Sequence, residues 1–185
     1  LKQKQKLIFL GGCHRRDKMG CKKIPDLINY DDYEGDYKKY ESDLYSAFDT
    51  SFGKKEYYFR GKKIKHKKNP EFQGKSCTFW HIISENVYHC EENRIPDFNR
   101  CARIKWPAFI LEYCCENCKN LLIWKNKRKN KTRVLIFCER IHYIVILEER
   151  AEYYVFWTAY PITYKHREKQ LKKEYEAYMI NNKKF

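Results

Sequence analysis

The C-terminal half of the chain alternates short apolar runs with polar connections. Four runs rich in Val, Ile, Phe, Tyr and Trp predict the strands of an antiparallel meander, at residues 121–124, 132–138, 143–147 and 153–162. The middle runs are apolar at nearly every position, so we expect cover on both faces of this sheet. Residues 165–179 follow as a charged helix with Leu171, Tyr175 and Tyr178 on one stripe.

The N-terminal half carries mainly helical patterns. Apolar residues recur at spacings of three and four over 36–52, and Pro96-Asp97 opens a second helix over 98–113 that Pro107 must kink or begin. Residues 56–68 alternate like two strands around Gly61, whereas the period of 78–84 does not decide between helix and strand. We therefore predict an α+β fold, with N-terminal helices packed on a four-stranded antiparallel sheet and a C-terminal helix.

Length and charge refine this picture. The 185 residues are enough for one domain, which we place at 36–185 after an irregular basic and acidic arm at 1–35. The net charge is +15, yet residues 26–49 hold eight acidic residues against two lysines. A basic body favours a polyanionic partner, although a well-solvated, lysine-rich protein is the plain alternative. Part of the acidic segment could screen the basic face, or it could be an ordinary solvated surface.

Nine cysteines without a secretory signal or membrane span predict a cytoplasmic protein with reduced thiols. Cys115 and Cys118 form a CxxC pair, and Cys13, His14 and Cys21 could add ligands to a zinc site. No second close pair of cysteines is present, and no acidic metal cluster or phosphate-binding glycine loop is visible. We therefore expect neither a metal nor a cofactor.

Several polar groups lie among large apolar side chains, where they need partners. His81 is the one histidine embedded in an apolar run; Arg94, Arg100 and Arg103 follow it, and Thr158 and Tyr160 share a strand face. Cleavage of a phosphodiester without metal requires a proton shuttle, fixed positive charge and a positioning hydroxyl, and these residues supply all three. The alternatives are a hydrogen-bonded core histidine, surface ion pairs and an ordinary strand pair.

The same residues carry a resemblance to a known group of proteins. The motifs are Arg60-Gly61-Lys62, 74–81 ending in Phe79-Trp80-His81, Arg94-Ile95-Pro96-Asp97, 100–106, Thr132-Arg133, Tyr143-Ile144-Val145 and 156–160. Over residues 40–178 they resemble phage- and mobile-element-associated bacterial RNases of the barnase, EndoU, colicin and RelE type. The chain departs from the group's pattern at Ala102, where an acidic residue is expected, and at Pro107.

The resemblance implies metal-independent RNA cleavage by 2′-hydroxyl attack on the concave face of an antiparallel sheet, often by a toxin or phage-defence effector. It gives His81 the role of general acid or base, Arg100 and Arg103 that of stabilising the phosphate, and Thr158 and Tyr160 that of positioning it. Further RNA contacts are expected from Arg94, Lys105, Trp106, Arg133, Trp157, His166 and Arg167.

Two other functions remain open from the sequence. The arginines, the aromatics and the basic runs 62–68 and 125–131 could bind RNA or DNA without cleaving it, with the two runs at hairpin ends. The basic face could instead meet an acidic protein, such as an antitoxin or inhibitor. No membrane partner is expected.

Overall fold

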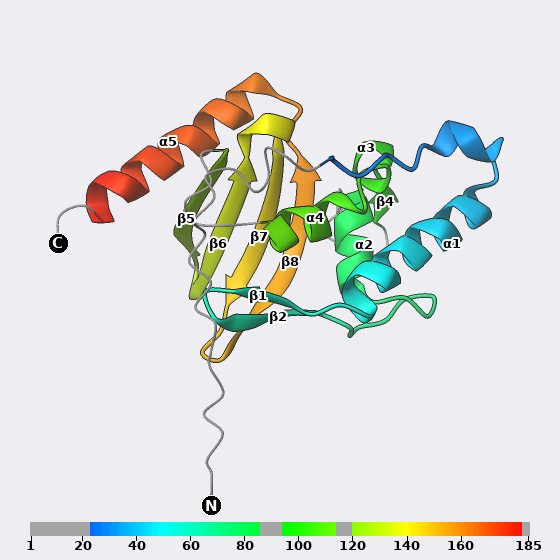
Figure 1. Ribbon diagram of the computed structural model, residues 1–185, viewed down its shortest axis with the longest axis horizontal. Coiled ribbons are helices and arrows are strands. Elements are labelled where there is room, and N and C mark those ends of the chain that lie inside the picture. Colours follow the sequence, from blue (N-terminus) through cyan, green and yellow to red (C-terminus); the bar gives the residue numbers. More distant parts are fainter. Residues whose placement is uncertain (1–22, 86–93, 114–119, 183–185) are drawn as a thin grey trace, which may run out of the picture.

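The computed structural model describes residues 23–85, 94–113 and 120–182 (Figure 1). Helices and strands are mixed along the chain, as the α+β prediction requires. In chain order they are η1 (Tyr30–Tyr33), α1 (Tyr37–Phe48), the π-helical turn η2 (Asp49–Gly53), β1 (Tyr57–Phe59), β2 (Lys62–His66), α2 (Cys77–Ile83), β3 (Ser84–Glu85), β4 (Ile95–Pro96), α3 (Phe98–Cys101), α4 (Trp106–Tyr113), β5 (Leu121–Arg128), β6 (Lys131–Cys138), η4 (Glu139–Ile141), β7 (Tyr143–Glu149), β8 (Tyr153–Pro161) and α5 (Lys165–Asn182).

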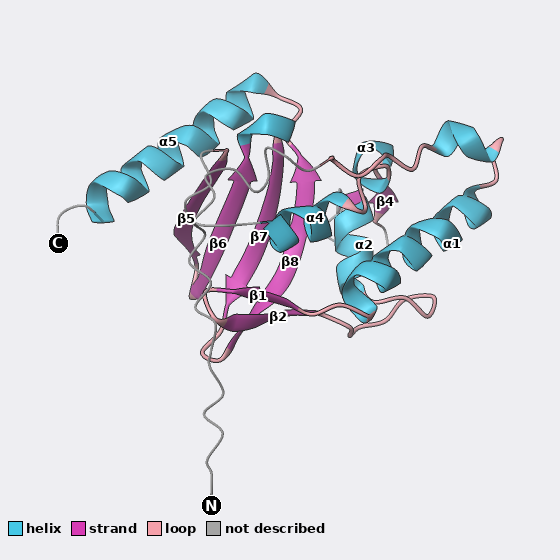
Figure 2. Ribbon diagram, viewed as in Figure 1, coloured by secondary structure: helices cyan, strands magenta, loops and turns pink. Residues whose placement is uncertain are grey.

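The main sheet has six strands in the order β1-β2-β8-β7-β6-β5, so the predicted four-stranded sheet is wrong in its extent (Figure 2). The four C-terminal strands form the expected antiparallel meander. The hairpin β1–β2 joins it because β2 pairs in parallel with the first half of β8, with Ile64 opposite Tyr154. Local alternation marked both short strands, but a parallel pairing across some ninety residues has no local signal.

Helix α2 lies along β8 beyond the point where its pairing with β2 ends. Strand β2 ends at His66, beside Phe156, and the second half of β8 then lies next to α2. Ser76 caps this helix by accepting a hydrogen bond from the Phe79 amide, and the undecided segment 78–84 is helical as far as Ile83, with Ser84 in β3. The hydroxyl of Thr78 contacts the carbonyl of Phe156 at 3.5 Å, so α2 is anchored directly to β8.

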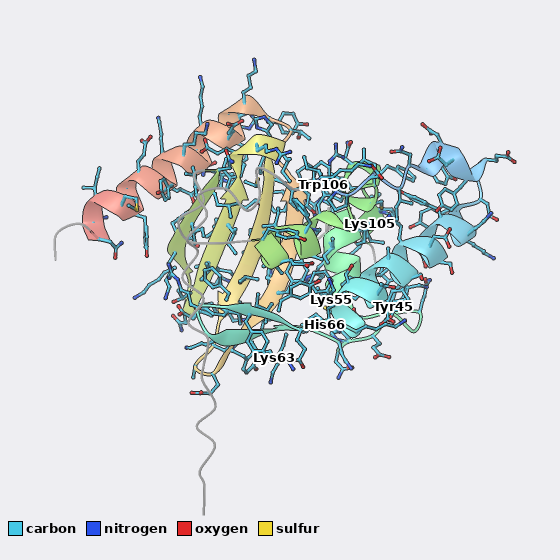
Figure 3. The ribbon with its side chains drawn as sticks, in the orientation of Figure 1. Tyr45, Lys55, Lys63, His66, Lys105 and Trp106 are labelled. Atoms are coloured by element: carbon cyan, nitrogen blue, oxygen red, sulfur yellow. The ribbon has the colours of Figure 1, made fainter. Side chains whose placement is uncertain are left out.

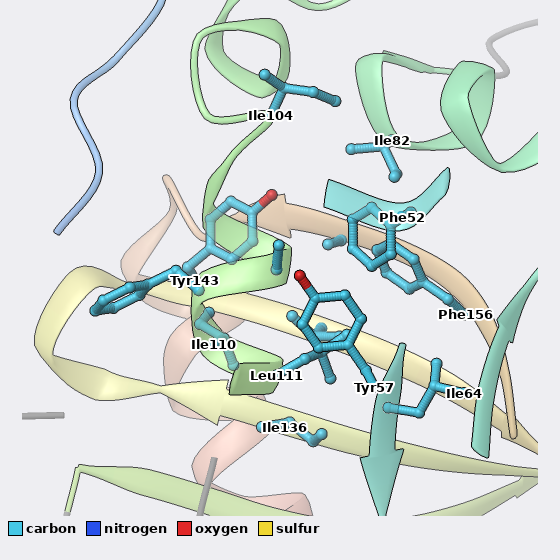
Figure 4. Close-up of a cluster of buried hydrophobic side chains, with 14 of the residues drawn as sticks. Phe52, Tyr57, Ile64, Ile82, Ile104, Ile110, Leu111, Ile136, Tyr143 and Phe156 are labelled. Carbon is cyan, nitrogen blue, oxygen red and sulfur yellow. The ribbon is translucent and has the colours of Figure 1, made fainter. Parts of the chain in front are cut away.

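One face of the sheet is covered by α2, α4 and η2, whose apolar side chains form the larger core (Figure 4). Phe52 packs on Phe156 with ring centroids 4.9 Å apart. Helix α1 packs on α2 through Tyr45 and Phe79 at 5.0 Å, and in Figure 1 it lies beyond α2 from the meander. The prediction that N-terminal helices pack on the four strands therefore holds for α2 and α4, whereas α1 packs on α2.

Helix α5 covers part of the opposite face, which we call the α5 face. Leu171 is fully buried there, and Tyr175 and Tyr178 pack beside it, so the predicted stripe is confirmed. Its apolar partners on the sheet include Trp124, Leu135, Phe137 and Ile144. They form the smaller core, in which α5, the helix that follows β8, packs on the sheet.

The predicted helix over 98–113 divides into α3 and α4. The Asp97 carboxylate caps α3, and Pro107 is the second residue of α4, where its missing amide hydrogen costs little. Residues 23–35, expected in a separate arm, contact the domain: the Ile28 amide donates to Ala102, and Trp106 donates to the Pro25 carbonyl. Among the described helices, none combines the length and apolar character needed to cross a bilayer.

Candidate functional site

A β-bulge in β8 shapes the open part of the α5 face. Ile146 pairs with Thr158 and Leu147 pairs with Phe156, so Trp157 is an extra residue in the strand. A bulge of this kind re-aims a side chain. Trp157 therefore meets Arg133 of β6, whose guanidinium carbon lies 4.0 Å from the centre of the indole ring. Arg133 shares its face with Leu135 and Phe137 by strand alternation.

Four residues predicted from the sequence meet around this bulge, and we call them, together with Glu148, the Trp157 site. The His81 ring lies edge-on to Trp157 with centroids 5.7 Å apart. The Thr158 hydroxyl donates a 2.9 Å hydrogen bond to the His81 carbonyl, which fixes the end of α2 against β8. The structure therefore brings His81, Arg133, Trp157 and Thr158 together from α2, β6 and β8.

Glu148 is the member of this site that sequence reasoning missed. It is 1% exposed, and it pairs directly with Arg133 across the β6–β7 ladder. Its carboxylate lies 3.5 Å from Nη2 of Arg133, 3.5 Å from Nζ of Lys131 and in contact with Arg150. Its position in β7 could have indicated this. Glu148 follows Ile146 by two residues and Ile144 by four, so strand alternation puts all three side chains on the α5 face.

The electrostatics of Arg133 are set by this burial. Loss of solvent lowers its pKa, and the carboxylate of Glu148 opposes that effect. Arg133 Nε, both Glu148 oxygens and Asn126 Oδ1 are buried and lack a well-aligned hydrogen bond within the described part of the chain. Asn126, Arg133 and Glu148 form one row across β5, β6 and β7. The row holds the Arg133 guanidinium with its side chain 15% exposed and Glu148 as its ion-pair partner.

Three hairpin turns place positive charge beside the Trp157 site, at the end of the sheet away from α5 (Figure 1). The turns join β1 to β2, β5 to β6 and β7 to β8, and Lys62 Nζ links two of them by donating to Ala151. Basic run 125–131 forms one hairpin end as predicted, whereas run 62–68 mostly lies in β2 and the segment after it. We call this region the basic end; its cations are Arg60, Lys62, Arg128, Lys129, Lys131 and Arg150.

A second group of predicted residues lines a cleft of about 330 Å³ farther along β8, which we call the Tyr160 cleft. Tyr160 shares the α5 face with Thr158, since the two residues pair with Ile144 and Ile146. Arg100 of α3 lies over the Tyr160 ring at 5.0 Å. Arg167 lines the cleft from α5, and His166 stacks on its rim residue Tyr164 with centroids 5.4 Å apart.

The guanidiniums of Arg94 and Arg100 are held by protein groups. Arg100 donates to the Ser84 carbonyl at 3.0 Å and to Glu85 at 2.8 Å, and its Nε lies 3.4 Å from Asp97. Arg94 donates to the hydroxyl and the carbonyl of the same serine. These contacts fix the short β3–β4 ladder on α3, so both arginines organise the wall of the cleft.

The remaining predicted residues lie elsewhere. Lys105 and Trp106 are at the start of α4, toward α1 (Figure 3). Arg103 stacks on Trp106 at 5.0 Å and donates to the Asn99 carbonyl, and Trp106 packs on Tyr143 in the larger core. The sequence grouped Arg103 with Arg100 because they are three residues apart, but the turn after α3 separates their side chains.

The acidic segment lies beside α3. Tyr30 of η1 stacks on Phe98 with centroids 4.8 Å apart, and Asp43 of α1 accepts a hydrogen bond from Tyr33. This segment therefore packs beside α3 and not at the Trp157 site. Screening of the basic face by the segment stays a prediction.

The possible zinc ligands Cys13, His14, Cys21, Cys115 and Cys118 lie outside the described residues. Cys77, Cys101 and Cys138 are buried and not in disulfide bonds, and burial raises the pKa of Cys101 to about 12. Within the described ranges, no three His, Cys, Asp or Glu side chains gather as metal ligands.

Comparisons with protein-family models, curated proteins and solved structures found no match to this chain.

Proposed function

We propose that this protein is a metal-independent endoribonuclease that acts in the cytoplasm as a toxin-like or phage-defence effector. One observation carries the proposal: an imidazole and a guanidinium contact the same tryptophan on an open sheet face, with Arg133 at 4.0 Å and His81 at 5.7 Å. An imidazole titrates near neutral pH, and a guanidinium matches the geometry of a phosphate. The proposed function has both groups act on one phosphodiester bound beside Trp157.

The proposed reaction begins with attack by the 2′-hydroxyl of the RNA on the adjacent phosphorus. The hydroxyl loses its proton as the new O–P bond forms, the bond from phosphorus to the 5′-oxygen breaks, and that oxygen gains a proton. His81 supplies one of these two proton transfers. Arg133 and Lys131 stabilise the charge that develops on the phosphate oxygens. Glu148 is a positioning residue, because it holds both cations at the site.

Arg133 takes the role that the sequence assigned to Arg100 and Arg103. The donors of Arg100 are directed at Ser84, Glu85 and Asp97, and Arg103 stacks on Trp106 away from the bulge. The hydroxyl hydrogen of Thr158 is directed at the His81 carbonyl, so this residue positions the catalytic helix. The basic end would guide the RNA backbone toward the site, and an acidic antitoxin could compete for that same surface.

We expect total RNA to be cleaved by the purified protein in the presence of EDTA. The proton shuttle and the cations of the Trp157 site are side chains, so a chelator should leave the rate unchanged. Gel analysis of RNA length measures the outcome, with end-group mapping to test for the 2′,3′-cyclic phosphate that this attack produces. Intact RNA, or cleavage that EDTA abolishes, would contradict the proposed mechanism.

Arg133→Ala should lower the cleavage rate by roughly 10²–10³, the scale of losing one oriented charge-stabilising donor. Arg133→Lys keeps the charge but loses the planar group that stacks on Trp157, so we expect only partial recovery. The exposed Arg140 on η4 provides the matched control, and Arg140→Ala should cleave at the wild-type rate. Equal rates for all three variants would exclude a catalytic role for Arg133.

The second candidate is an RNA-binding protein without catalysis, and the basic end next to the half-buried Trp157 favours it. Lysines and arginines at the three turns would bind phosphates, and Trp157 would stack on a base. This function predicts an affinity that falls steeply with salt while the RNA keeps its length.

A further inference from the structure

We infer that the Tyr160 cleft binds one nucleotide of the RNA and selects bases that carry an exocyclic amino group over uracil. The inference rests on the proposed function, since it places this nucleotide next to the phosphodiester that the Trp157 site cleaves. Thr158 and Tyr160 lie on one face of β8 two residues apart, which separates them by roughly 7 Å. One chain of RNA can therefore contact both places along the same strand.

The cleft offers an acceptor on one wall. Arg100 donates a hydrogen bond to Oε1 of Glu85 and its Nε lies beside Oδ2 of Asp97. Oδ1 of Asp97 accepts hydrogen bonds from the amides of Asn99 and Arg100. Among the described residues, Oε2 of Glu85 receives no hydrogen bond, and the Glu85 side chain is 52% exposed. Arg94 and Arg100 balance the charges of Glu85 and Asp97 in this wall, so its accepting group is Oε2 of Glu85. It therefore favours hydrogen-bond donors in a ligand.

The opposite rim supplies a stacking surface and a cation. Tyr164 is 67% exposed and its ring lies nearly parallel to that of His166, at 27°. Exposed aromatic rings of this kind stack on unpaired bases. The guanidinium of Arg167 has Glu174 at 3.7 Å as its ion-pair partner, a distance that leaves its donors available to a phosphate. Base, acceptor and phosphate contacts can then be made by one nucleotide in a cleft of about 330 Å³.

These groups together discriminate between bases. Adenine, cytosine and guanine each carry an amino group that can donate to the Glu85 carboxylate. Uracil has no amino group, and its one donor on that edge, N3–H, lies between two carbonyl oxygens that repel a carboxylate. The selectivity therefore depends on Glu85, whereas the affinity for every base depends on Tyr164.

Binding of AMP, CMP, GMP and UMP by titration calorimetry tests the inference. We expect UMP to bind at least about tenfold more weakly than the other three, the scale of one hydrogen bond to a charged group. Glu85→Gln should remove this discrimination because an amide can also donate, whereas Glu176→Gln, an exposed change on α5, should preserve it. Tyr164→Ala should weaken all four by roughly 5- to 150-fold. Tyr58→Ala, at a tyrosine that is 58% exposed on β1, is its control.

Equal affinity for the four nucleotides, or affinities unchanged in Glu85→Gln and Tyr164→Ala, would overturn the inference. Mononucleotides contain no internucleotide bond, so their binding does not depend on cleavage. RNA cleavage in EDTA without selective binding would therefore overturn only the base-binding cleft. Selective binding with RNA left intact would support the cleft and overturn only the proposed nuclease activity.

Discussion

His81→Ala should lower the rate of RNA cleavage by roughly 10²–10⁴ while the protein stays folded. This is the range of a single general acid–base group. The imidazole lies between α2 and the Trp157 ring at a partly exposed position, so its removal leaves the buried side of α2, including Phe79 and Ile82, in place. Initial rates on one RNA substrate measure the effect, and circular dichroism with thermal melting checks the fold.

The matched control for this variant is His142→Ala. His142 lies before β7, where its Nδ1 is 3.0 Å from Glu168, so it shares the residue type of His81 but lies outside the Trp157 site. We expect its rate to equal that of the wild type. A His81→Ala protein that unfolds would support the alternative of a core histidine. A folded one with full activity would exclude His81 from the chemistry.

Glu148→Ala should lower the free energy of unfolding by about 3–5 kcal/mol, the cost of removing one partner from a buried ion pair. The carboxylate is 1% exposed and lies among Lys131, Arg133 and Arg150, so its loss leaves three cations close together without their counter-charge. Chemical denaturation measures the change. Glu152→Ala, an exposed position in the adjacent turn, should change stability by less than about 0.5 kcal/mol.

A double-mutant cycle separates the ion pair from simple packing. If Glu148 acts on Arg133, then Glu148→Ala combined with Arg133→Ala should cost clearly less than the sum of the two single changes. Additive costs would show that the carboxylate does not hold this guanidinium. The same cycle bears on catalysis, because a positioning residue should lose its effect on rate once Arg133 is absent.

Local sequence patterns determined much of the secondary structure. Short runs of β-branched and aromatic residues between polar connections marked all four strands of the meander, and the Leu171, Tyr175 and Tyr178 spacing marked the buried side of α5. These signals are local because an element must turn its apolar side toward the core at its own period. The hairpin around Gly61 was visible for the same reason. The segment 78–84 was too short and too uniformly apolar for its period to be read.

The candidate site was predicted in part. His81 stood out as an imidazole in an apolar run, and Trp157 and Thr158 lay in a distinctive strand, but their meeting with Arg133 depends on the bulge in β8. A bulge changes the direction of side chains without a clear mark in the sequence. Glu148 was overlooked because a single carboxylate near the end of an apolar run is indistinguishable, in sequence, from the start of a polar turn.

The sequence by itself determined that the chain is an α+β protein with a basic body and an aromatic-rich meander. Only the tertiary structure decided which arginine contacts Trp157 together with His81. Arg100 and Arg103 are neighbours along the chain, yet one is fixed in the wall of the Tyr160 cleft and the other stacks on Trp106. Arg133 reaches Trp157 because β6 and β8 flank β7 in one sheet. Strand order and register are set by packing between segments that are distant in the chain. They bring together residues that no local sequence pattern links.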